Sequence, residues 1–288
     1  MVGAAFTFSL MALCVKLAGQ TLPSEQLVLF RAGVALVLSW VMLRRRAISP
    51  WGTHRGLLAL RGLAGFGGLS CYFYAVVHLP LADATVLQYL NPVLTAVLAA
   101  VVLGERLRWP EAASIAVSLT GVLLVTRPAL LFGGQAGPDP FASAVALLGA
   151  AFSAVAYVTV RKIGTREHPL VIVFWFPLVA TPLSLPAVLE VWVWPTVPGW
   201  ALLLAVGLLT QVAQVLMTRG LQLEPAGRAT AVSYLQVVFA TLWGVLVFGE
   251  RPDAWTLCGA TLIVSSAFLL LRGARAQSTK GGRPAPGA

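Results

Sequence analysis

Polar side chains recur inside the long apolar stretches of this 288-residue chain, and they are the residues that could do chemistry. The sequence has no Walker loop, no paired carboxylates within a helix and no His/Cys/Asp cluster. Amides and phenols bind small molecules through hydrogen bonds and ring contacts, so recognition of a solute is expected rather than catalysis. The residues expected to line a substrate-binding cavity are Tyr72, Tyr74, His78, Gln88, Tyr89, Asn91, Tyr157, Gln211, Gln214, Ser233, Tyr234 and Gln236.

Helical spacing unites several of these residues. Gln88, Asn91 and Thr95 recur every three or four positions, as Gln211 and Gln214 do in a later segment. Residues at this spacing share one face of an α-helix, and uncompensated polar groups are costly in lipid. Interhelical hydrogen bonding without a solute would account for each residue taken singly. Because the residues gather in a few segments, we favour a lined cavity.

Three charged residues lie at the ends of apolar segments or within them. Lys16 can reach the lipid headgroups by extending its side chain along the helix. Arg31 lies deeper, and we expect it to contact Glu25 or helix-end carbonyl groups, or to meet a carboxylate of the cargo. Lys16, Glu25 and Arg31 are therefore predicted to be gating or helix-end charges.

Prolines inside the apolar segments are candidate hinges. A proline removes one backbone donor and bends a helix. The hinge positions expected on this basis are Pro92, Pro177 and Pro182, although such kinks can also serve packing alone.

Acidic residues are confined to the ends of the apolar segments. Proton-coupled export of a cation usually needs a carboxylate within the membrane. The sequence therefore favours a neutral or zwitterionic cargo and gives no sign of strong proton coupling.

The segments that must position these residues are long and apolar. The chain is 58% hydrophobic and only 10% charged, with a mean hydropathy of +0.86. A helix needs roughly 20 apolar residues to cross a bilayer. The expected spans are 2–18, 25–43, 57–77, 83–103, 110–126, 141–162, 170–189, 200–221, 228–248 and 254–271. The fold class is thus an all-α integral membrane protein with ten transmembrane helices.

Glycines at 62, 65, 67 and 68 superficially suggest a phosphate-binding loop. They lie within the apolar span 57–77, where small residues let two helices approach closely. We expect them to serve packing.

The net charge of +10 does not indicate nucleic-acid binding, because the basic residues lie in short loops between apolar runs. Such loops stay in the cytoplasm, and here they alternate, which places both termini inside. Cys14, Cys71 and Cys258 lie apart at no metal-like spacing, so neither a metal nor a cofactor is expected. The expected partners are the lipid bilayer and a small-molecule substrate.

An internal repeat defines the domain organisation. Residues 84–106 align without a gap to residues 229–251, including Gly104-Glu105-Arg106 and Gly249-Glu250-Arg251. The matched segments are five crossings apart, so the copies would run in opposite directions through the bilayer. We expect inverted five-helix repeats over 1–133 and 138–271, followed by a disordered, basic, Gly/Pro-rich tail over 272–288.

The repeated segment resembles the EamA domain of the drug/metabolite transporter superfamily. The resemblance covers almost the whole chain and includes Lys16, the stretch from Glu25 to Arg31, and Tyr89-Leu90-Asn91-Pro92. The second copy departs from it, with Gln236-Val237 in place of Asn91-Pro92, so any motion that depends on this proline would be asymmetric. The resemblance implies a carrier of the bacterial inner membrane that exports amino acids or related metabolites by alternating access.

The cargo is left open among several classes. Tyr72, Tyr74 and His78 make the chain similar to exporters of aromatic amino acids, while related carriers transport drugs or nucleotide derivatives. An intramembrane enzyme is the alternative from another class; Ser70 and His78 could form a dyad, but no oxyanion framework accompanies them.

Overall fold

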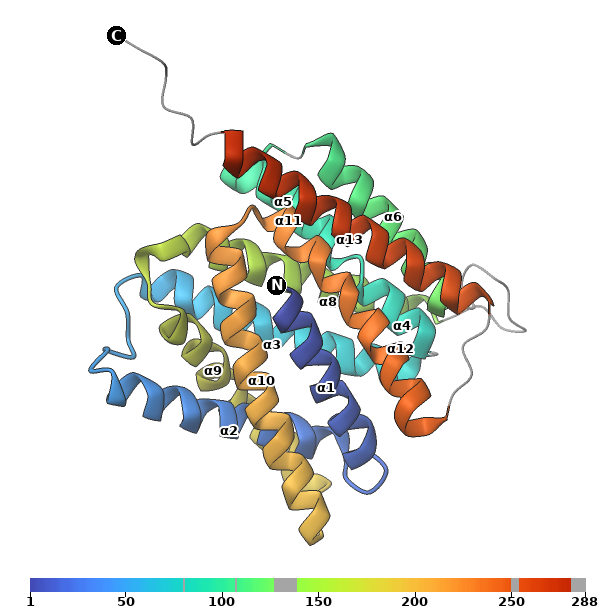
Figure 1. Ribbon diagram of the computed structural model, residues 1–288. Coiled ribbons are helices and arrows are strands. Elements are labelled where there is room, and N and C mark those ends of the chain that lie inside the picture. Colours follow the sequence, from blue (N-terminus) through green and yellow to red (C-terminus); the bar gives the residue numbers. More distant parts are fainter. Residues whose placement is uncertain (80, 107, 127–138, 250–253, 281–288) are drawn as a thin grey trace.

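The computed structural model describes residues 1–79, 81–106, 108–126, 139–249 and 254–280, and side chains at all of these except 76–77, 81–83, 126 and 269–280. All regular secondary structure in this part of the chain is helical, as predicted, and no strand occurs in it (Figure 1). The helices of the first half are α1 (Val2–Ala18), α2 (Ser24–Arg45), α3 (Arg55–His78), α4 (Leu81–Gln88), α5 (Asn91–Leu103) and α6 (Trp109–Thr126). Those of the second half are α8 (Pro140–Ile163), η1 (Gly164–Arg166), α9 (Pro169–Glu190), α10 (Val197–Leu223), α11 (Ala226–Ala231), η2 (Val232–Tyr234), α12 (Leu235–Phe248) and α13 (Ala254–Lys280).

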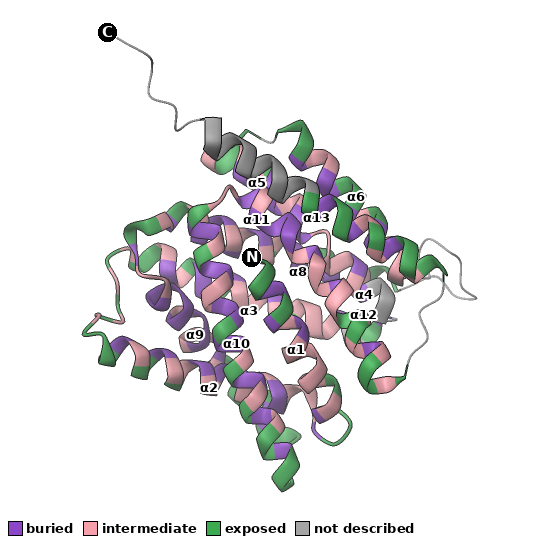
Figure 2. Cartoon of the chain, in the orientation of Figure 1, coloured by how far each residue is buried: buried purple, intermediate pink, exposed green. Residues whose placement is uncertain are grey.

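Seven helical segments are long and apolar enough to cross a membrane, which makes the chain a multi-pass membrane protein. They are Ser24–Arg45, Arg55–Ala75, Ala84–Leu103, Pro140–Arg166, Pro169–Glu190, Val197–Leu223 and Ala226–Phe248. Three shorter apolar helices are Val2–Ala18, Trp109–Val125 and Ala254–Phe268. Large apolar side chains such as Val101 and Leu246 are exposed on the outside, where lipid rather than water would cover them. Exposed residues alternate with buried ones along α6 and α10, whereas much of α9 is buried (Figure 2).

The helix ends follow from local sequence. The Asp139 carboxylate accepts hydrogen bonds from the backbone N–H groups of Phe141 and Ala142 and so caps α8. Gly104 and Gly249, the glycines of the repeated Gly-Glu-Arg motif, end α5 and α12 with the same left-handed φ of 66°. Other residues rarely adopt this conformation, so the repeated glycine terminates both helices in the same way.

The main contacts between a helix of the first half and a helix of the second half have equivalent contacts in which the two halves swap roles. α3 packs against α8, and its counterpart α10 packs against α1 (Figure 1). The contact of α5 with α8 corresponds to that of α12 with α1. The contact of α10 with α2 corresponds to that of α3 with α9. α2 packs against α9 and α6 against α13, each helix against its own counterpart. The two halves therefore form one interlocked bundle.

Helix breaks occur at matching positions in the two halves. α4 and α5 are separated at Tyr89 and Leu90, just before Pro92, whose ring nitrogen cannot donate to the preceding turn. In the second half a 3-10 turn, η2, interrupts the helix at the matching position although no proline is present. There the hydroxyls of Thr230 and Ser233 donate to backbone carbonyls three or four residues earlier, which bends helices. Val237 stands where the first half has Pro92, yet both halves have a helix break just before this position.

α9 runs without interruption from Pro169 to Glu190 through Pro177 and Pro182. The hinge role of these two prolines therefore requires bending of a continuous helix and stays a prediction. The tail that was expected to be disordered from residue 272 is helical as far as Lys280. Residues 274–280 include Ala, Arg, Gln and Lys, which are strong helix formers. The end of the first repeat at 133, the start of the second at 138 and residues 281–288 lie outside the described residues.

Small residues let α3 and α8 approach closely. A Cβ atom placed on Gly149 would lie 2.9 Å from the Cβ of Cys71 and 3.3 Å from the carbonyl oxygen of Gly68. A Cβ placed on Gly68 would in turn lie 3.2 Å from the carbonyl oxygen of Gly149. The glycines of α3 thus serve helix packing, as expected from the sequence.

Gly149→Ala is therefore expected to push α3 and α8 apart and to lower the free energy of unfolding by about 1–3 kcal/mol. Gly33→Ala is the matched control, since a Cβ at Gly33 has no neighbour within 4 Å. Both substitutions change helix propensity equally, so the difference between their thermal midpoints in lipid nanodiscs measures the packing term. Equal midpoints would contradict close α3–α8 packing.

Candidate solute-binding cavity

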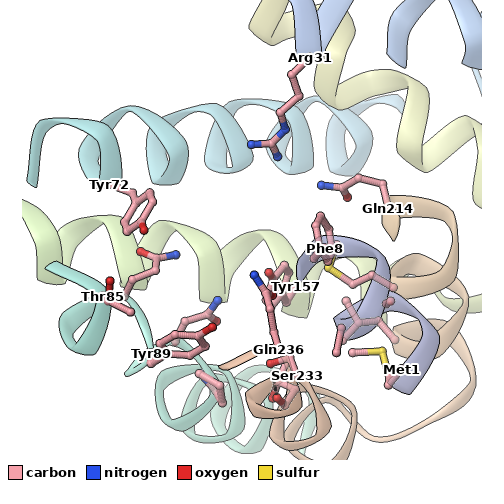
Figure 3. A pocket seen from close by; sticks show the side chains of 18 residues that line it. Met1, Phe8, Arg31, Tyr72, Thr85, Tyr89, Tyr157, Gln214, Ser233 and Gln236 are labelled. Carbon is pink, nitrogen blue, oxygen red and sulfur yellow. Dashed lines mark hydrogen bonds between the residues drawn. The ribbon is translucent and has the colours of Figure 1, made fainter. Parts of the chain in front are cut away.

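A cavity of about 260 Å³ lies between the two halves of the chain and is called the main cavity below. In Figure 3, Arg31, Tyr72 and Gln214 point toward the same space from three different helices. The lining residues are Met1, Ala4, Ala5, Phe8, Arg31, Tyr72, Thr85, Gln88, Tyr89, Asn91, Pro92, Tyr157, Gln214, Met217, Leu221, Thr230, Ser233 and Gln236. Helices α1 to α5 supply one part of the wall, and α8, α10, α11, η2 and α12 supply the other.

A smaller chamber of about 130 Å³ adjoins the main cavity and is called the arginine chamber. Both Arg31 and Arg61 line it. The two spaces share the side chains of Arg31, Tyr72, Gln88, Tyr157 and Gln214. The two spaces therefore lie next to each other and share a polar wall.

Many of the predicted site residues meet in this region. Of the residues proposed from the sequence to bind substrate, the main cavity brings together Tyr72, Gln88, Tyr89, Asn91, Tyr157, Gln214, Ser233 and Gln236. It also includes Arg31, predicted as a gating charge, and Pro92, predicted as a hinge. They come from several helices of both halves, so their convergence depends on how these helices pack.

Tyr74 and His78 lie elsewhere. They line a separate cavity of about 370 Å³ between α2, α3 and α9, together with Glu25. Their rings stack at 3.9 Å between centroids, and the Nδ1 atom of His78 is 2.9 Å from the Tyr74 carbonyl oxygen. Two residues along a helix correspond to a rotation of about 200°, so Tyr72 and Tyr74 point to opposite sides of α3.

Gln211 and Tyr234 are structural in this conformation. The Oε1 atom of Gln211 accepts from the Ser39 hydroxyl at 3.1 Å, which joins α10 to α2. The fully buried Tyr234 donates its hydroxyl to the carbonyl oxygen of Tyr89 at 2.9 Å. These two tyrosines are equivalent in the repeat, and the bond supplies a donor to a backbone carbonyl at the break between α4 and α5.

Arg61 is a site residue that sequence reasoning missed. It lies inside α3, only 2% exposed, and its Nη2 atom donates to the Oε1 atom of Gln214 at 3.2 Å. The signal was a single charge within the apolar span 57–77, beside the glycines that allow close packing. Intramembrane charges are expensive and usually functional, so a charge at this position indicates a functional residue, as it does at Arg31.

Charged residues at the helix ends tie the halves together. Glu105 of the first Gly-Glu-Arg motif accepts from the Nε atom of Arg161 at 2.5 Å and from the backbone N–H of Ala226 at 2.9 Å. Lys16, the repeat counterpart of Arg161, lies over the ring of Phe248 at 4.0 Å. Glu250, which corresponds to Glu105, lies outside the described residues.

A second polar cluster joins the loop before α3 to the loop before α9. The Oε1 atom of Glu167 accepts from the backbone N–H groups of Thr53 and His54 at 2.6 and 2.7 Å, and from the Thr53 hydroxyl at 2.6 Å. Burial raises the pKa of the Glu167 carboxyl, but these hydrogen bonds together outweigh burial and hold the pKa below its usual value of 4.5. The ionised carboxylate is thus part of the folded structure.

A bundle of apolar helices around a polar cavity built from both halves is the architecture of a membrane solute carrier. The EamA-like transporter family matches residues 1–127 and again residues 140–272. The chain belongs to this family, which confirms the resemblance predicted from the repeat.

Two similar proteins are named as an exporter and as a solute carrier. The pseudopaline exporter CntI of Pseudomonas aeruginosa is 36% identical over 270 residues, covering 93% of each chain. Human solute carrier family 35 member G1 is 30% identical over 276 residues, covering 91% of this chain and 75% of that protein. A solved crystal structure shares the fold with a TM-score of 0.83 and 24% identity, covering 96% of this chain and 97% of the other.

Glu167→Gln is expected to lower the free energy of unfolding at pH 7 by about 1–3 kcal/mol, because hydrogen bonds to a charged acceptor are lost. The depressed pKa gives the sign: the wild-type advantage is fully present above pH 4.5 and is lost as pH falls through the folded-state pKa below that value. Denaturation of both proteins in detergent between pH 3 and pH 8 checks this. A difference that stays constant across this range would rule out the ionised carboxylate as its source.

Proposed function

We propose that the protein is a secondary carrier that exports amino acids and related metabolites across the bacterial inner membrane by alternating access. In this proposal ten helices cross the membrane as two inverted five-helix repeats, 1–133 and 138–271, with both termini in the cytoplasm. The gapless internal repeat, the alternation of basic loops and the exchangeable helix pairs support that arrangement.

The main cavity is the observation that carries the proposal. Its polar lining comes from both halves, so a rocking motion of one half against the other would change the access to a bound solute. Amides at Gln88, Asn91 and Gln236 and phenols at Tyr72 and Tyr157 suit the carboxylate and ammonium groups of an amino acid. The residues that line this cavity include no pair of carboxylates and no His/Cys/Asp cluster of the kind that soluble enzymes use in catalysis.

The breaks between α4 and α5 and between α11 and α12 are the hinges that we propose for this motion. They lie at matching positions of the two halves and border the main cavity at Tyr89, Pro92 and Ser233. Irregular backbone within a membrane is tolerated where it borders a cavity, and hinges take up changes of backbone angle at such helix ends. Pro177 and Pro182 remain hinge candidates only through bending of the continuous helix α9.

Export is favoured over uptake by the similarity to CntI, which is named an exporter. A preference for aromatic amino acids has weaker support, since only Tyr72 of the three aromatic residues behind it lines the main cavity. Multidrug or nucleotide-derivative transport is the alternative within carriers, and lipid chemistry is the alternative from another class.

Counterflow in proteoliposomes tests the proposal. Liposomes preloaded with unlabelled amino acids should accumulate the labelled compound only when the protein is present. Gln236→Leu should reduce this flux about tenfold, because the proposed hydrogen bond between the Gln236 amide and the solute would be lost at a cost of about 1–1.5 kcal/mol. Gln20→Leu is the matched control at an exposed position outside the cavity.

Several outcomes would count against the proposal. Equal flux in the Gln236→Leu and Gln20→Leu proteins would remove the main cavity from the transport route. Counterflow of drugs or nucleotides without counterflow of amino acids would favour the other carriers. Turnover of a lipid without any flux would favour an enzyme.

A further inference from the structure

Two positive charges lie together inside the membrane-spanning bundle. The guanidinium carbons of Arg31 and Arg61 lie 5.9 Å and 5.4 Å from the centre of the same Phe176 ring. Both residues line the arginine chamber. α2 supplies one arginine and α3 the other, so the pair depends on the packing of two different helices.

Neither arginine has an acidic partner in the described part of the protein. Arg61 donates to the neutral amide of Gln214, and its Nε atom, like that of Arg31, is buried without a hydrogen-bond acceptor. The residues that line the main cavity and the arginine chamber include no Asp or Glu. The helix-end arginines differ, since Arg161 and Arg228 are paired with Glu105 and Glu111.

Burying a charge without a counterion costs several kcal/mol, and a second like charge nearby adds to the cost. A protein that only needed polar packing here could use amides at lower cost. An anion in the cavity would remove the penalty, because guanidinium groups bind carboxylates through paired, charge-assisted hydrogen bonds.

An acceptor beside the two arginines adds a further requirement. The Nε2 atom of Gln88 donates to the Ser153 hydroxyl at 3.3 Å, whereas its Oε1 atom is buried without a donor. Gln88 lines both the main cavity and the arginine chamber. A cargo with an N–H group next to its acidic groups would satisfy this oxygen.

We propose that the cargo of this carrier is an anionic amino-acid derivative with at least two carboxylates, held by Arg31 and Arg61, and with a nitrogen donor that reaches Gln88. The inference rests on the proposed carrier function and narrows its substrate class. An anionic cargo replaces the neutral or zwitterionic cargo expected from the sequence, because that expectation was based on the acidic residues and left out Arg61.

The test compares matched probes that differ in one acidic group. Binding of L-glutamate and L-glutamine, and of the larger pair L-glutamyl-L-glutamate and L-glutamyl-L-glutamine, is measured by calorimetry on the full chain in nanodiscs. In at least one pair the acidic probe should bind wild-type protein about tenfold or more tightly than its amide, the scale of one charge-assisted contact. No preference for the acidic probe in either pair would overturn the proposal without any variant.

Variants then test the assignment of the two arginines. At least one of Arg31→Gln and Arg61→Gln, the one that removes the partner of the differing acidic group, should reduce the preference for the acidic probe to about threefold or less. The other should weaken both probes of a pair. Arg219→Gln removes the same charge from an exposed position and should leave the preference unchanged. Circular dichroism shows whether each variant is folded, and Arg31→Lys and Arg61→Lys, which keep the charge, are measured alongside. A preserved preference in both Gln variants would overturn the assignment.

Counterflow with the same probes separates this inference from the carrier proposal. Flux of neutral amino acids but not of acidic ones would leave the carrier intact and overturn the anionic cargo. Arginine-dependent binding of an acidic probe without flux of any solute would support the anion site and count against the carrier.

Discussion

Backbone hydrogen bonding in an apolar solvent is the constraint on which the rest of this structure depends. Lipid offers no partner to a free N–H or C=O group, so the segments that cross the membrane are helical. The breaks at Tyr89–Leu90 and at η2 are exceptions that the protein can tolerate because they lie at the seam between the halves. There the Tyr234 hydroxyl supplies a donor to the Tyr89 carbonyl, and the main cavity borders both breaks.

The same constraint applies to side chains and gives the cavity its chemistry. The side chains of Gln211 and Ser39 are hydrogen-bonded to each other. At the helix ends, the Glu105 carboxylate accepts hydrogen bonds from Arg161 and from a backbone N–H group. Arg31 and Arg61 are not compensated in this way within the described residues. In the proposal made above, an acidic solute that enters from water balances their charge, so the cost of burying two positive charges favours an acidic cargo.

The fold was largely predictable, because apolar length, helix-ending glycines and a gapless repeat are all local in sequence. Part of the cavity was predictable from polar residues within apolar segments, as for Gln88 and Asn91, which both face it although a helix break separates them. Tyr74 lies outside the main cavity because the step of about 200° from Tyr72 turns it to the opposite side of α3. Tyr234 and Gln211 could not be separated from cavity residues, since their partners, Tyr89 and Ser39, are remote in sequence. Arg61 was missed although its charge inside an apolar span was visible.

Access to the main cavity from both sides of the membrane is the central claim, and thiol labelling at Gln236 tests it most directly. Cys14, Cys71 and Cys258 would be replaced by Ala, Gln236→Cys introduced, and a membrane-impermeant thiol reagent applied to right-side-out and inside-out vesicles. The account predicts that the new cysteine is labelled from either side, and that cargo slows the reaction in both cases. Labelling from one side only, in every condition and with unaltered rate in the presence of cargo, would contradict it.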